Sequence, residues 1–413
     1  MSLIKLHYVR MNRYDYIIIL TIVSVIFAGE LFGAFVPIKI IGSLSSIYFV
    51  FFFRGWKKDY MKRIKVILAF FVLFLLHVLV SAFWISDVKN YLIASLSLYC
   101  YIFDFLLIFV CAQKANKPIN SILHGWIVFL LLNLVCSFWE ISTGNHFTTG
   151  SFQADAVERD IYGTWSNRVY SAVTYGNYNS YALLLCLVML FVLLYIYFKE
   201  DLKNRLFAVF LFFCIVAILF INTSRGSLLS LLFFMVPLWY VIWRLDKIRY
   251  LILCFLVIGG TYLWLEYSDW IIFLIQRKLE SRSGASDDPR WLLWKAGWDI
   301  AIKWLFIGSG PGSMMYEYAQ ENVFILYAHN LWIQLLVEYG ILITCIFAFL
   351  YLKLLFFTLF SKDKFLRIIG LYLLLCWPIL TIIDEGYMKS FHWIFFASVY
   401  SLYYCRKYML WTK

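Results

Sequence analysis

Two arginines, Arg225 and Arg290, and one histidine, His329, are the residues of this sequence whose types and positions best suit chemistry. Each lies in a polar segment beside a long apolar run. A guanidinium stays charged at physiological pH and binds an anion through two parallel hydrogen bonds. An imidazole titrates near neutral pH and can accept a proton from a hydroxyl group. These residue types predict a site that binds an anion and activates a hydroxyl.

Arg225 lies in the run Asn-Thr-Ser-Arg-Gly-Ser at 222–227, a short turn between two apolar runs. A guanidinium is costly at such a place unless it reaches water or an anionic partner. An anion site is one interpretation. The other is a loop arginine bound to a backbone carbonyl or a lipid headgroup.

Arg290 falls in the first turn of a predicted helix that Asp288 caps and Pro289 begins. Free backbone N–H groups and the positive end of the helix would add to its charge, which favours a phosphate site. Asp287 and Asp288 oppose this charge in part, so an ion pair at the helix cap is the alternative.

The predicted helix runs from 289 to Gly308, and one of its faces is apolar. That face carries Trp291, Trp294, Trp298, Ile302 and Leu305, whereas Lys295, Asp299 and Lys303 lie on another. Such a helix suits the membrane interface. The run Gly-Ser-Gly-Pro-Gly at 308–312 then demands a tight, irregular backbone.

His329 and Asn330 lie where a long polar loop returns to an apolar run. Here His329 could act as a general base near the bilayer surface. The alternative is that the pair only caps the next helix.

The rest of the sequence must position these residues, and its composition requires a membrane. Of the 413 residues, 63% are hydrophobic and 15% are charged, whereas about a quarter of the residues in soluble proteins are charged. We count about twelve runs that meet the ~20-residue length of a membrane span. They lie near residues 14–30, 34–53, 66–85, 91–112, 121–141, 177–198, 206–221, 228–243, 250–267, 331–356, 368–383 and 391–405.

Basic residues predict the orientation, because short loops rich in Lys and Arg stay in the cytoplasm. They place both termini in the cytoplasm, together with the stretch from Arg54 to Lys65 and the clusters at 114–117, 199–205, 244–249 and 362–367. The net charge of +12 therefore indicates topology and contact with lipid headgroups, not nucleic-acid binding.

A single polytopic membrane domain over 1–413 is the predicted organisation, since no internal repeat or linker divides the chain. Two outside loops are long, at 142–172 and 268–328, and the second is expected to carry part of the active site. Asp104 is an intramembrane acid, for which a function and a helix-to-helix hydrogen bond are both open. Paired acids such as Asp384 and Glu385 could bind a divalent cation, but without further ligands they are weak evidence for a metal site, and no metal is predicted.

The motifs together resemble the O-antigen ligase and O-antigen polymerase superfamily of bacterial envelope glycan enzymes. The resemblance rests on the turn at 222–227, Arg-Trp-Leu-Leu-Trp at 290–294, the glycine run at 308–312, and His329-Asn330 followed by Gln334, Glu338 and Gly340. The run from Arg168 to Asn179 also looks like the family's junction between loop and span.

The resemblance implies a GT-C-like, inverting, metal-independent glycosyltransferase of the bacterial cytoplasmic (inner) membrane, with no cofactor. Its donor would be a glycan on undecaprenyl diphosphate, and its active site would be extracytoplasmic. Arg225 and Arg290 would stabilise the diphosphate and His329 would serve the acceptor hydroxyl. The substrate-binding residues would be Arg168, Asn330, Gly310, Gly312 and Glu338.

Two acceptors fit this chemistry. A lipid-linked repeat unit would make the protein an O-antigen or capsule polymerase, which we favour because nothing in the sequence identifies a core-lipid partner. A lipopolysaccharide core would make it an O-antigen ligase. A secondary transporter or lipid flippase is the alternative from another class, but its expected related halves are not found.

Overall fold

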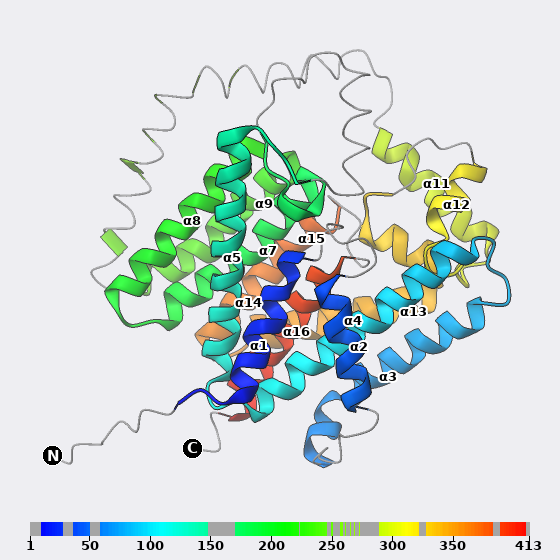
Figure 1. Cartoon of the computed structure of the whole chain (residues 1–413), viewed down its shortest axis with the longest axis horizontal. Helices are drawn as coiled ribbons and strands as arrows, with labels where there is room; N and C mark the ends of the chain where they lie inside the picture. Colours follow the sequence, from blue (N-terminus) through cyan, green and yellow to red (C-terminus); the bar gives the residue numbers. More distant parts are fainter. Residues whose placement is uncertain are drawn as a thin grey trace.

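The computed structural model describes residues 10–27, 36–49, 58–147, 170–222, 224–245, 249–250, 289–321, 328–382 and 389–409, with a few single residues between 257 and 272. Within these ranges the ordered elements are helices, and no strand occurs. This confirms the predicted all-α class (Figure 1). The helices are α1 (Arg13–Val23), α2 (Pro37–Ile47), α3 (Lys58–Ser81), α4 (Val88–Lys114), α5 (Pro118–Thr143), α7 (Tyr178–Phe198), α8 (Leu202–Asn222), α9 (Arg225–Ile242), α11 (Pro289–Lys303), α12 (Met314–Gln320), α13 (Leu331–Leu359), α14 (Lys364–Leu375), α15 (Trp377–Leu380) and α16 (Ser390–Tyr404), with short turns η1 (Ser24–Phe27), η4 (Val173–Tyr175) and η5 (Cys405–Met409).

Six of the described helices are long and apolar enough to cross a membrane: α4, α5, α7, α8, α13 and the Ile64–Ser81 part of α3. Pro37–Ile47 and Gly226–Ile242 are shorter apolar helices. The predicted span at 250–267 lies almost wholly outside the described residues. These helices support a multi-pass membrane protein, whereas about twelve spans and a GT-C-like arrangement stay predictions.

The core of the bundle is α7, whose residues from Ser180 to Ile196 are all buried. A helix that is apolar on every side is stable only when protein or lipid surrounds it. Here α5, α8, α9 and α14 pack around it (Figure 1). α9, which begins at Arg225, is therefore anchored to this central helix.

A buried carboxylate, Asp15, joins the start of α1 to the turn between α4 and α5. It accepts hydrogen bonds from the backbone N–H groups of Asn116 and Lys117, at 3.1 and 3.0 Å, and from the Ser121 hydroxyl at 2.6 Å. We call this contact the Asp15 clasp. It brings the start of α1, the end of α4 and the start of α5 to one end of the bundle.

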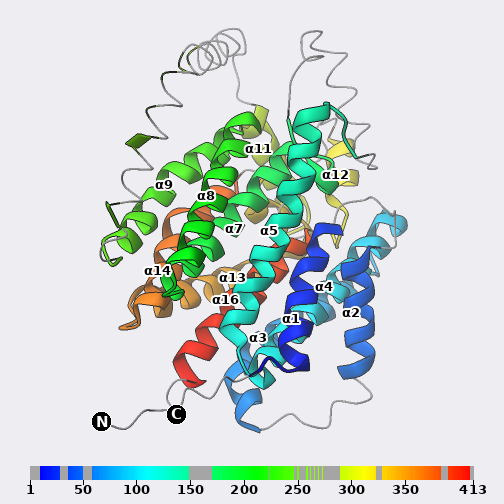
Figure 2. The ribbon, with the colours of Figure 1, turned by 60° about the vertical axis from the view of Figure 1, so that its left-hand side comes forward.

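Other basic segments meet at the same end. Lys199, after α7, donates to Asn120 at 2.8 Å. Cys405, after α16, lies against the Ala112 carbonyl of α4 at 3.8 Å, and the next residue, Arg406, pairs with Asp363 at 2.7 Å. Figure 2 shows the start of α3 and the end of α16 at this end, and α11, α12 and the end of α5 at the other. Among the described residues, the clusters at 114–117, 199–205 and 362–367, predicted to share one side of the membrane, therefore share one end of the bundle.

Two predicted element boundaries are wrong. α11 ends at Lys303 rather than Gly308, because Leu305 and Phe306 have left-handed φ angles of 48° and 59°. The N–H of Phe306 turns back to the Ala301 carbonyl at 2.8 Å and closes the helix. The run at 368–383 is also not one helix, since α14 ends at Leu375 and α15 begins at Trp377, with a proline in its first turn.

Candidate functional site

The first turns of α11 lie against Ala328, the residue before His329. As predicted, α11 begins at Pro289, and Arg290 in its first turn is exposed. Trp294, one turn later, donates its indole N–H to the Ala328 carbonyl at 3.0 Å. Residues i and i+4 share a face of a helix. The structure therefore brings the face of α11 that carries Arg290 next to His329.

His329 has an unusual backbone, with a φ of 47°. Left-handed backbone is uncommon outside glycine, costs about 1–3 kcal/mol and clusters at functional sites. Its neighbour Asn330 is the N-cap of α13, because its Oδ1 accepts the N–H groups of Trp332 at 2.9 Å and Ile333 at 3.3 Å. The capping function thus falls to Asn330, and a substrate contact by Asn330 stays a prediction.

α13 is broken at Gly340, where φ is 75° and ψ is 179°. The break frees the carbonyl groups of Val337 and Glu338 from helical pairing. Ser309 N–H donates to the first at 2.8 Å and Gly310 N–H donates to the second at 3.0 Å. The glycine run at 308–312 therefore fills the break and completes the backbone hydrogen bonds of α13.

Glu338 fixes the same run through its side chain, which is buried. Its carboxylate accepts the N–H of Gly312 at 2.9 Å. The approach is close, since a Cβ at Gly308 would lie 2.7 Å from the Glu338 carbonyl oxygen and one at Gly340 would lie 2.3 Å from that of Phe306. The N–H groups of Gly310 and Gly312 are thus used within the protein. Substrate contacts by Gly310, Gly312 and Glu338 stay predictions.

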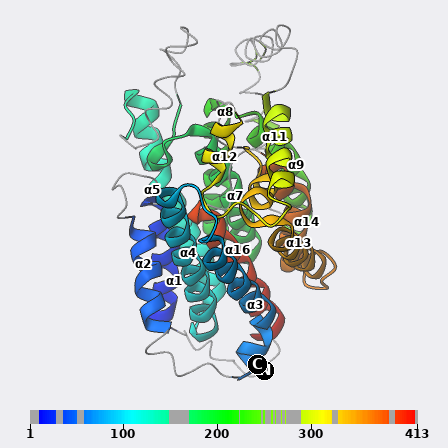
Figure 3. The same cartoon turned by 90° about the vertical axis from the view of Figure 1, so that its right-hand side faces the viewer.

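α12 is held to α11 by two polar contacts. The Tyr318 hydroxyl donates to the Leu293 carbonyl at 2.7 Å. Lys303 donates to the buried Glu317 carboxylate at 3.0 Å, and this hydrogen bond raises the pKa of Lys303. α11, α12 and the start of α13 thereby form one unit at the end opposite the Asp15 clasp (Figure 3).

Most of the apolar face predicted for α11 points away from this unit, although Trp294 packs into it. Trp291, Trp298 and Leu305 are 63%, 49% and 80% exposed. The face that packs on the protein instead carries Leu293 and Ile300, which are buried. An exposed tryptophan face fits the predicted place at the membrane interface.

Arg225 is the first residue of α9, and its side chain lies outside the described part of the structure. α9 packs on the short helix α15. Thr381, directly after α15, accepts the Leu331 N–H at the start of α13 at 2.8 Å. α9, which begins at Arg225, and α13, which begins two residues after His329, therefore both contact α15 or the residue that follows it. Arg168, Asp384 and Glu385 lie outside the described residues.

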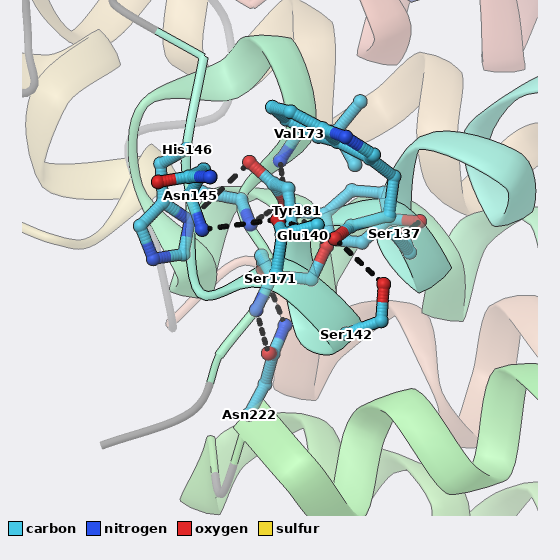
Figure 4. A network of polar contacts seen from close by, with 12 residues as sticks. Ser137, Glu140, Ser142, Asn145, His146, Ser171, Val173, Tyr181 and Asn222 are labelled. Atoms are coloured by element: carbon cyan, nitrogen blue, oxygen red, sulfur yellow. Dashed lines mark hydrogen bonds and ion pairs between the residues drawn. The ribbon is translucent and has the colours of Figure 1, made fainter. Parts of the chain in front are cut away.

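A polar network that we did not predict lies at the same end, around Glu140 in the last turn of α5 (Figure 4). This fully buried carboxylate accepts the Ser171 hydroxyl at 2.7 Å and the backbone N–H groups of Ala172 and Val173 at 2.9 and 2.8 Å. Asn222 joins the network by bonding to both the N–H and the carbonyl of Ser171. Glu140 lies inside the predicted span at 121–141, and an acidic residue within an apolar run is the sequence feature that could have indicated this network.

Within the described ranges, no three His, Cys, Asp or Glu side chains cluster as metal ligands would. The reaction without a metal stays a prediction, as does anion binding by the arginines and the start of α11.

The fold and the site define a helical, multi-pass membrane protein with a polar site at one end of its bundle. Residues 210–348 match the model of the O-antigen ligase family, a stretch that includes Arg225, Arg290 and His329. The match confirms the predicted resemblance to the O-antigen ligase and O-antigen polymerase superfamily. No curated protein sequence matches the chain.

Proposed function

We propose that this protein is an enzyme that transfers a glycan from undecaprenyl diphosphate to a sugar hydroxyl on the extracytoplasmic face of the bacterial cytoplasmic membrane. The observation that carries the proposal is the 3.0 Å hydrogen bond from Trp294 to the Ala328 carbonyl. It joins the helix start that carries Arg290 to the strained turn of His329. Glycan transfer from a diphosphate needs a positively charged group that binds the diphosphate. It also needs a base, such as an imidazole, close to the acceptor hydroxyl.

The proposed reaction is a single displacement at the anomeric carbon. As the acceptor oxygen forms its bond, the bond to the diphosphate oxygen breaks and the leaving group gains negative charge. Arg290, the N-terminus of α11 and Arg225 stabilise that charge. His329 accepts the proton of the attacking hydroxyl. One displacement inverts the anomeric configuration, and no metal takes part.

The remaining predicted residues bind and hold the substrates. Arg168 would add charge to the diphosphate site, and Asn330 would contact a sugar from its place at the start of α13. Gly310, Gly312 and Glu338 would line the acceptor side, where the glycine run already packs into the break of α13. Lipid tails would lie between the membrane spans.

The proposed topology has about twelve spans in a GT-C-like arrangement, as the ~20-residue apolar runs indicate. The end with the Asp15 clasp would be cytoplasmic, because the basic segments gather there. The end with α11, Glu140 and His329 would face outward, where both sugars react.

We propose a repeat-unit polymerase for O-antigen or capsule, whose acceptor is a second lipid-linked glycan. An O-antigen ligase that uses a lipopolysaccharide core is the second candidate, and the description of the matching family favours it. The test is to incubate purified protein with undecaprenyl diphosphate-linked glycan, alone and with lipid A core. Longer lipid-linked chains made without the core would support a polymerase, and products formed only on the core would support a ligase.

A transporter is less consistent with the break in α13. Transporters use broken helices to offer free backbone groups to a substrate near the membrane midplane. Here the carbonyls of Val337 and Glu338 already accept N–H groups from Ser309 and Gly310.

A further inference from the structure

Glu140 closes a network that ties together three segments of the outer end (Figure 4). It lies in the last turn of α5 and receives hydrogen bonds from three successive residues, Ser171, Ala172 and Val173. On its other oxygen it receives His146 Nδ1 at 3.3 Å. A buried carboxylate is costly unless such donors satisfy it. These hydrogen bonds to a buried carboxylate therefore fix the positions of the segments that they join.

Asn222 carries the network to the turn before Arg225. It is the last residue of α8, and its side-chain amide accepts the Ser171 N–H at 2.8 Å and donates to the Ser171 carbonyl at 2.9 Å. α9 begins three residues later with Arg225. Asn222, at the start of the α8–α9 turn, is thus bonded to the backbone of Ser171, and Ser171 is in turn bonded to Glu140.

The network also joins the two sides of the outside loop at 142–172. The His146 ring stacks on the Tyr170 ring with centroids 4.1 Å apart and an interplanar angle of 13°. His146 follows α5 and Tyr170 precedes the residues bound to Glu140. The two ends of this loop therefore meet beside the turn that leads to Arg225.

We infer that Glu140 is a positioning residue, which sets the donor affinity of the enzyme by fixing the α8–α9 turn that carries Arg225. This inference rests on the proposed function. Glu140 does not touch the substrate; it acts through Ser171 and Asn222. A guanidinium binds phosphate well only when its planar fork is oriented, so a small shift of the turn weakens the diphosphate site.

The test compares two variants that neutralise matched buried carboxylates at opposite ends of the bundle. Glu140→Gln weakens the acceptor of Ser171, Ala172 and Val173 while keeping the side-chain shape. Asp15→Asn does the same to the Asp15 clasp, which receives one hydroxyl and two backbone N–H groups between different helices. Both variants lose comparable hydrogen bonds, but only Glu140 is linked, through Ser171 and Asn222, to the end of α8 that precedes Arg225.

Three measurements are made at equal amounts of folded protein: kcat and KM for the donor, binding of undecaprenyl diphosphate alone, and amide hydrogen exchange at residues 171–173. For Glu140→Gln we expect faster exchange at these amides. We also expect donor KM and undecaprenyl diphosphate Kd to rise about 10-fold or more, the scale of one charge-assisted hydrogen bond, with kcat changed less. Asp15→Asn should leave all three close to wild type.

Normal undecaprenyl diphosphate binding by Glu140→Gln, or an equal loss in Asp15→Asn, would overturn the positioning inference and leave the proposed function in place. Unchanged exchange at residues 171–173 would show that the carboxylate does not hold this backbone, and would also overturn it. Failure of the wild-type protein to bind undecaprenyl diphosphate would overturn the proposed function and, with it, the role of Glu140.

Discussion

Arg290 is exposed in the first turn of α11, where its charge and the helix N-terminus act at one place. We predict that Arg290→Lys strongly lowers the rate of glycan transfer although the charge is kept. A compact ammonium cannot make the two parallel hydrogen bonds that a phosphate receives from a guanidinium. The initial rate of transfer, at equal protein level, is the measurement.

Lys295 offers a matched control for Arg290, because it is an exposed cation on the same helix one turn further along. Lys295→Ala should leave transfer near the wild-type rate. Full activity in Arg290→Lys would reduce Arg290 to a generic cation.

His329 combines a left-handed backbone with a place beside α11. Loss of a general base lowers rates by about 10²- to 10⁴-fold, so His329→Ala should transfer at well below roughly one tenth of the wild-type rate. Binding of undecaprenyl diphosphate should persist, because the arginines hold the donor. Transfer and binding are measured on the same preparation.

Asn330 provides the control for the capping alternative. Asn330→Ala removes an N-cap and should cost about 1 kcal/mol of stability. Were His329→Ala to lose stability in the same way and keep near-normal transfer, its role would be structural. Loss of donor binding would instead place His329 in the diphosphate site.

The sequence could suggest Arg290 and His329 because their side chains define their chemistry wherever they lie. It could not reveal the role of Glu140, because two of its donors are the backbone N–H groups of Ala172 and Val173. Backbone donors leave no mark in a sequence. Only the fold shows that residues 140, 171 and 222 meet.

The residues at 306–312 pack into the break of α13, and the backbones approach most closely at Gly340. We predict that Gly340→Ala sharply lowers the temperature at which the protein loses its fold. It would force a side chain into left-handed backbone and place Cβ 2.3 Å from the Phe306 carbonyl oxygen. The midpoint of thermal unfolding in detergent measures the effect.

Gly144 separates the two causes, because its φ is also positive, at 69°, but no other atom lies within 4 Å of its Cβ position. Gly144→Ala should therefore cost only the backbone penalty of about 1–2 kcal/mol. Equal losses in the two variants would argue against tight packing of the glycine run on α13.

Helix starts were more predictable than helix ends. The start of α11 follows from Asp288 and Pro289, whose geometry is local. Its end at Lys303 does not, since Leu305 and Phe306 adopt left-handed backbone that branched and aromatic side chains disfavour. The Phe306 carbonyl is used in a tertiary contact, because it accepts the Ile341 N–H at 2.9 Å.

At the scale of the molecule, the two ends of the bundle should lie on opposite sides of the membrane. Lys203 is an exposed residue at the basic end, and Asn145 is an exposed residue just after α5. We predict that an impermeant maleimide labels Asn145→Cys in intact cells, and labels Lys203→Cys only after permeabilisation. The unmodified chain gives the background from native cysteines. Labelling of Lys203→Cys alone in intact cells would reverse the orientation.

The membrane class was predictable because apolar surplus and basic loops are properties of composition. The number of spans stays a prediction, because α2 and α14 are only 11 and 12 residues long and α15 follows a break. Apolar runs show where a chain is buried in lipid or protein, but not where its helices stop.

The most direct test of the account follows one turnover of purified protein with undecaprenyl diphosphate-linked glycan and an acceptor, in the presence of a chelator. We predict one undecaprenyl diphosphate released for each glycosidic bond formed, with the anomeric configuration inverted in the product. His329→Ala should form neither product at a comparable rate. Donor moved across a liposome membrane without any new glycosidic bond, or a bond formed with retained configuration, would contradict the account.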